Sequence, residues 1–124
     1  MNSKITKMTK NNYTTRVTIS PFKYDVLVIL ANNFNAALAE LGIGREYREK
    51  AALFAVNKEH RALVFNASIL DHGLIAHESA HCVFSAMAEA GQDPVSAEET
   101  FAYMLEDLVD SIHTFCKAKK VKID

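Results

Sequence analysis

The sequence contains few of the residues that build disulfide scaffolds, membrane spans and low-complexity tails. Its 124 residues include two cysteines, two prolines, four glycines and no tryptophan. The longest apolar run, 26–31, is far shorter than the roughly 20 residues that span a bilayer. No apolar segment follows the first lysines, as a secretory signal would require. We therefore expect a cytoplasmic protein in which Cys82 and Cys116 are reduced and largely buried thiols.

A charge excess of either sign is also missing. The formal net charge is −1, and 23% charged with 49% hydrophobic residues is ordinary for a globular protein. Lysines gather near both ends of the chain, which favours a solvated fringe over a nucleic-acid contact. We expect no nucleic-acid partner and no membrane partner. The length suits a single domain over residues 1–124.

The hydrophobic pattern predicts strands first and long helices afterwards. Strand-like runs cover residues 3–19 (two runs around Asn11-Asn12), 22–30, 51–56 and 62–65, with a short helix over 34–41. Ser68 and Asp71 have the spacing that opens a helix, and that helix continues to Gly91. Asp93-Pro94 then marks the start of the last helix. The predicted fold is α+β: an antiparallel sheet with a short helix in about 1–66, then two long packed helices in about 68–118.

The first long helix carries His77-Glu78-Ser79-Ala80-His81, an H-E-x-x-H motif without proline or glycine. Residues four apart share one face of an α-helix, so both imidazoles can bring a nitrogen to one Zn²⁺. Glu78, one step round the helix, is placed to contact a zinc-bound water rather than the metal. The motif predicts a zinc site with Glu78 as general base. The alternatives are two core histidines bonded to backbone carbonyls and a solvated helical glutamate.

A catalytic zinc usually has a third protein ligand, and the last helix offers candidates. The turn at Gly91 folds that helix back against the first, so a side chain near position 99 can approach His81. Glu98 and Glu99 are both placed for this, and adjacent helix residues cannot both face the metal. Glu99 also has a structural alternative, because Ser96 and Glu99 have the spacing of a capping box.

Followed by Glu99-Thr100-Phe101-Ala102-Tyr103, the H-E-x-x-H motif resembles the gluzincin-type zinc metallopeptidases, most closely small phage-encoded ones. The resemblance covers about residues 50–115 and implies a zincin-like minimal domain. It implies His77, His81 and Glu99 as zinc ligands and Glu78 as catalytic base. Tyr103 stands where many larger members carry Asp or Asn. Its hydroxyl can stabilise an oxyanion or a ligand, while the alternative is a core residue at the helix–helix seam.

Together these features predict a zinc-dependent metallopeptidase that hydrolyses a peptide or protein substrate with a metal-activated water. A free strand edge of the sheet can pair with an extended substrate. The alternative is a non-catalytic zincin-like interaction module, such as a phage adaptor or a host-defence antagonist. Small size and the lack of a second domain to form the far wall of a cleft support that alternative. Glu78 favours the enzyme, since a purely structural zinc site needs no base.

Overall fold

The computed structural model describes residues 12–44, 50–57 and 60–124. In chain order the elements are β1 (Asn12–Ile19), β2 (Tyr24–Ala31), α2 (Phe34–Glu40), β3 (Ala52–Val56), β4 (Arg61–Asn66), α3 (His72–Glu89) and α4 (Glu98–Ala118). A sheet followed by two long helices confirms the predicted α+β class. Within the described ranges no helix has both the length and the apolar character needed to cross a membrane.

The four strands form one mixed sheet in the order β1-β2-β4-β3. β1 pairs with β2, and β3 with β4, in antiparallel fashion, whereas the central strands β2 and β4 run parallel. The parallel pairing of β2 with β4 departs from the antiparallel sheet that the sequence suggests. The chain leaves β2, forms α2 and returns through the β3–β4 hairpin, so β4 enters in the direction of β2. As a result β1 and β3 are the two edges of the sheet that the described residues form.

The first hairpin lies later in the chain than the sequence pattern suggests. β1 begins at Asn12, and the turn to β2 is made by residues 20–23. This turn contains a cis Ser20–Pro21 bond and Lys23 at a φ of 54°. Ser20-Pro21, which interrupts the strand pattern in the sequence, therefore belongs to the turn of the first hairpin. The strand expected before Asn11-Asn12 lies outside the described residues.

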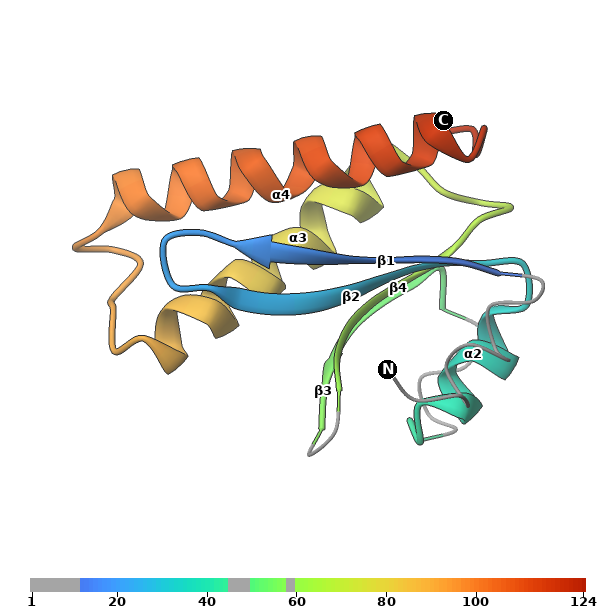
Figure 1. Ribbon diagram of the computed structural model, residues 1–124, viewed down its shortest axis with the longest axis horizontal. Coiled ribbons are helices and arrows are strands. Elements are labelled where there is room, and N and C mark those ends of the chain that lie inside the picture. Colours follow the sequence, from blue (N-terminus) through green and yellow to red (C-terminus); the bar gives the residue numbers. More distant parts are fainter. Residues whose placement is uncertain (1–11, 45–49, 58–59) are drawn as a thin grey trace.

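Different helices cover the two faces of the sheet (Figure 1). Alternate residues of β2 divide between them: Val26, Val28 and Leu30 join the core under α3 and α4, while Leu27 and Ile29 join the core under α2. All five side chains are at most 3% exposed. A strand buried on both faces appears as a continuous apolar run, which explains the unbroken hydrophobic pattern of this segment.

α3 is held at its start by Asp71, the residue before its first turn. The Asp71 carboxylate accepts a hydrogen bond of 2.7 Å from the backbone N–H of Leu74, which satisfies one of the free donors of the helix end. Ser68 hydrogen-bonds to Asn66 instead of pairing with Asp71. Asp71 is therefore the N-cap, and the predicted opening by Ser68 is wrong.

α4 starts later than Asp93-Pro94 suggests. The carbonyl of Asp93 accepts a hydrogen bond from the N–H of Ala97, which closes a turn before the helix begins. Ala97 then occupies the N-cap position and makes no side-chain cap bond. Because the cap lies one residue after Ser96, the capping box between Ser96 and Glu99 is not formed.

Candidate metal site

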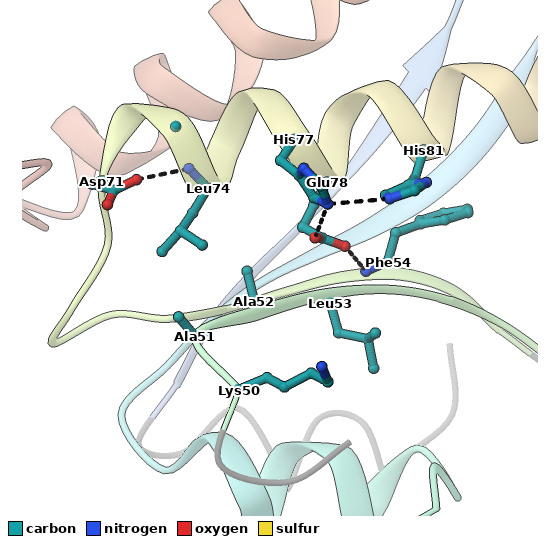
Figure 2. A pocket seen from close by; sticks show the side chains of 11 residues that line it. Lys50, Ala51, Ala52, Leu53, Phe54, Asp71, Leu74, His77, Glu78 and His81 are labelled. Carbon is teal, nitrogen blue, oxygen red and sulfur yellow. Dashed lines mark hydrogen bonds and ion pairs between the residues drawn. The ribbon is translucent and has the colours of Figure 1, made fainter. Parts of the chain in front are cut away.

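The H-E-x-x-H residues lie in the first half of α3, on the side that faces the edge strand β3 (Figure 2). His77 and His81 are exposed, whereas only 9% of Glu78 is exposed. One ligand atom from each of the three lies within 4.8 Å of the other two. Among the described residues this is the only group of three or more His, Cys, Asp or Glu side chains that could hold a metal ion.

The two imidazoles have the separation that a single zinc ion requires. Nε2 of His77 lies 3.3 Å from Nε2 of His81, and the rings meet nearly edge-on at 77°. Two nitrogens bound tetrahedrally at about 2.0–2.1 Å from zinc are about 3.3–3.4 Å apart. The donor atoms and their spacing therefore fit a zinc ion without a change of the helix.

Glu78 points toward the sheet and connects it to the imidazole pair. Its Oε1 accepts a hydrogen bond of 2.8 Å from the backbone N–H of Phe54 on β3 (Figure 2). Its Oε2 lies 3.6 Å from Nε2 of His77. One carboxylate oxygen is thus anchored to the edge strand, while the other faces the place where a metal would bind.

These side chains line an open pocket of about 840 Å³ between α3 and β3. Five consecutive residues, 50–54, contribute to its wall. Because neighbouring strand residues point to opposite faces of a sheet, a wall made of consecutive residues is the strand edge itself. The pocket therefore places the metal-ligating cluster beside an open border of the sheet.

Along β3, the backbone N–H and C=O groups of successive residues point in turn toward β4 and toward this pocket. Ala51 accepts a hydrogen bond from the N–H of Asn66 on the β4 side, and Asn57 donates to His60. Between these two positions, the residues whose backbone groups hydrogen-bond to β4 are therefore the odd-numbered ones. In an antiparallel ladder the N–H and C=O of one residue point the same way. Those of Ala52 and Phe54 consequently face the pocket.

The two long helices pack antiparallel, and two ring contacts define their register. The His72 ring lies 5.0 Å from that of His113, and Phe84 stacks on Phe101 at 4.8 Å. The start of α3 thus lies beside the later part of α4. The first turn of α4 lies beside the second half of α3, beyond His81.

In this register Glu99 is level with the part of α3 beyond His81, whereas Tyr103 is level with Cys82, the residue that follows His81. Glu99 is exposed in the first turn of α4, next to the equally exposed Glu98, and neither belongs to the metal-ligating cluster. Tyr103 is 63% exposed and is neither a core residue nor part of the pocket wall. Among the described residues, Glu78 is the only carboxylate in the cluster.

Cys82 follows His81 but faces the other side of the helix. Its side chain is fully buried in the core, and burial raises its pKa to about 12. A metal is bound by the thiolate, which is scarce at neutral pH when the pKa is this high. Its place in the core agrees with the sequence-based expectation, and Cys82 is not a ligand candidate.

Phe54 is the residue of this site that the sequence pattern does not reveal. It contributes a backbone N–H, and every residue except proline has one, so no residue type marks it. Only the strand order, which places β3 at the edge beside α3, brings this group to Glu78.

Comparison of the chain with protein-family models, with curated proteins and with solved structures finds no match. The resemblance to gluzincins therefore rests on its short motifs. The structure adds a cluster of two imidazoles and one carboxylate, His77, His81 and Glu78, that could bind a metal ion at a strand edge.

Proposed function

We propose that the protein is a zinc-dependent peptidase in which His77 and His81 bind the metal and Glu78 is the general base. The observation that carries this proposal is the 3.3 Å separation of the two Nε2 atoms at an open strand edge. Imidazole ligands with tetrahedral spacing suit Zn²⁺. Calcium and magnesium prefer shells of oxygen ligands, which this cluster lacks.

A zinc ion at this site would act as a Lewis acid and would lower the pKa of a water molecule toward 7. Glu78 would accept a proton from the attacking water through Oε2, the oxygen that Phe54 does not bind, and pass it to the leaving amine. His77 and His81 are both exposed, so the remaining metal positions face solvent and substrate. This arrangement of the side chains supports the proposal that the site hydrolyses a peptide carbonyl.

An extended peptide is the substrate class that the pocket favours. The N–H and C=O groups of Ala52 and the C=O of Phe54 face the pocket and can pair with a peptide backbone. Such pairing would lay the peptide along β3 and past His77, Glu78 and His81 (Figure 2). Main-chain pairing gives affinity for many sequences, so we expect broad rather than narrow sequence preference.

The third zinc ligand is a separate part of the proposal. The family resemblance implies Glu99, which lies in the first turn of α4 and outside the metal-ligating cluster. With the elements arranged as they are here, two histidines would hold the metal, and water or substrate would complete its shell. Substitution of Glu99 distinguishes these arrangements.

A non-catalytic module that binds metal or peptide is the second candidate function. Its support is that the described part of the chain supplies two histidines and one carboxylate to the cluster, and that this carboxylate already bonds to Phe54. Such a protein would bind zinc, an extended partner or both at the same edge without turnover.

The deciding experiment measures zinc content and cleavage of a mixed peptide library for the parent protein and for Glu78→Gln. Glutamine has the same size but cannot accept the proton, so we expect about one zinc per chain in both proteins and a loss of about 10²–10⁴-fold in kcat/KM. Glu106→Gln, an exposed change on α4, is the control and should behave as the parent. A zinc-loaded parent that cleaves no peptide would leave the binding module as the function.

A further inference from the structure

The contact between Glu78 and Phe54 joins the predicted base to a backbone donor that has no role in the sheet. The N–H of Phe54 points away from β4, because the hydrogen-bonded positions of this hairpin are 51, 53, 55 and 57, and Phe54 lies opposite Leu63 at a position without ladder bonds. An edge strand leaves such groups to solvent or to other partners. Here Glu78, 24 residues away in the sequence, accepts this hydrogen bond at 2.8 Å.

This bond restricts a side chain that would otherwise rotate freely. A glutamate has three rotatable bonds, and the base must keep one oxygen within hydrogen-bond reach of the proton that it accepts. With Oε1 held by the strand, Oε2 lies 3.6 Å from Nε2 of His77, on the side of the imidazole pair. The burial of Glu78 to 9% exposure removes competing water from the anchored oxygen.

We propose that the backbone N–H of Phe54 is a positioning group for Glu78 and that β3 thereby orients the general base as well as the substrate. This inference rests on the proposed peptidase function. Phe54 acts through Glu78 and does not itself touch the reacting atoms. Loss of its N–H should therefore slow turnover while zinc binding stays intact, because the imidazoles belong to α3 alone.

The strand position allows a test with proline, since the N–H that proline removes at residue 54 makes no hydrogen bond to β4. Proline is tolerated on edge strands where the N–H points away from the sheet. Phe54→Pro loses both the N–H and the aromatic ring, and Phe54→Ala loses only the ring, so their ratio isolates the N–H. Circular dichroism, thermal unfolding and zinc content should match between the two variants and show that both fold.

For the kinetic comparison we expect kcat of Phe54→Pro to be about 10- to 100-fold below that of Phe54→Ala, with KM within about threefold. In the Glu78→Gln background the same pair should have equal residual activity, because the N–H then has no base to position. Equal kcat in the two Phe54 variants overturns the proposal. A difference confined to KM also overturns it, since the N–H would then bind substrate.

Amide hydrogen exchange gives a readout that needs no activity. In the parent, the Phe54 amide should exchange more slowly than the Ala52 amide, which also points outward, and Glu78→Ala should remove this difference. Equal exchange rates of the two amides in the parent would show that the hydrogen bond from Phe54 to Glu78 is not formed, and would overturn the proposal. A parent protein that binds zinc, shows the protected amide and cleaves nothing instead rejects the peptidase function, so the two failures are distinguishable.

Discussion

In the described part of the chain the sheet ends at two edge strands, β3 and β1, and each lies beside a long helix (Figure 1). At the β1 edge, residues 15–20 and one face of α4 line a groove of about 700 Å³. It is built like the pocket at β3, from consecutive strand residues and a helix surface. Its helical side chains include Asp107, Asp110, Ser111 and Thr114, and none of the described residues that line it is a His or Cys.

The comparison of the two edges shows that a strand edge beside a helix does not by itself make a candidate metal site. Both offer a strand border and a helix surface, but only α3 brings two imidazoles together beside it. Only at β3 does a helical carboxylate, Glu78, bond to the strand backbone among the contacts of the described residues. The chemistry therefore comes from a single turn of α3.

The largest effect should follow from removing an imidazole. His81→Ala or His77→Ala leaves one nitrogen ligand at the cluster, so we expect at least a 100-fold loss of zinc affinity by isothermal titration and no turnover. His113→Ala removes a histidine of α4 outside the cluster and should keep parent affinity. Zinc bound as tightly by His81→Ala as by the parent would place the metal elsewhere.

The buried side of α3 should make the fold sensitive to alkali. Burial raises the pKa of Cys82 from its usual 9.0 to about 12, so the folded protein holds a proton that the unfolded chain loses. The resulting stability is complete below pH 9 and is lost as pH rises toward 12. Urea unfolding should show a loss of roughly 2 kcal/mol between pH 8 and pH 10.5.

Cys82→Ala should flatten this dependence. Val83→Ala, a neighbouring core truncation without a titrating group, should lower stability equally at both pH values. If stability fell with pH equally steeply in the two variants, the effect would belong to Tyr24 and Cys116. Burial raises the pKa of these two groups as well.

The helices beside the two edges also differ at their starts, since Asp71 caps α3 and Ala97 provides no side-chain cap for α4. Asp71→Ala should cost about 1 kcal/mol of unfolding free energy. Ala97→Asp should raise stability by a smaller amount, measured in the same urea titration. Zinc affinity should change less than tenfold in Asp71→Ala, and a loss as large as that of His81→Ala would make Asp71 part of the metal site.

The smallest effect is expected at Glu99. In the observed packing it lies outside the cluster, as does Glu98, so Glu99→Ala and Glu98→Ala should agree in zinc affinity within about twofold. The family resemblance instead implies a large loss for Glu99→Ala alone. That result would show that α4 moves toward His81 when the metal binds.

The sequence predicts well those features that depend on local periodicity. The i, i+4 spacing of His77 and His81 places both imidazoles on one helix face, and their Nε2 atoms do lie 3.3 Å apart. The continuous apolar pattern of β2 likewise reflects burial on two faces. Both follow from side-chain direction within one element, which the order of residues determines.

Features that depend on the pairing of distant elements could not be predicted in this way. The parallel pairing of β2 with β4 depends on the path of the crossover, and it makes β3 an edge strand. The bond from Phe54 to Glu78 then depends on that edge. The two helix starts are misplaced because Ser68 and Asp93-Pro94 have the residue types of a helix start, yet Asp71 and Ala97 occupy the cap positions.

The 3.3 Å contact between the two imidazoles has a consequence for how metal enters. Two Nε2 atoms at this distance form a hydrogen bond only if one ring of the neutral pair carries its proton there and the other presents a lone pair. Zinc needs a lone pair from both. The donor ring must therefore switch tautomer and move its proton to Nδ1. Metal and proton therefore compete for one nitrogen of the pair, and binding of zinc would require the donor ring to present its lone pair first.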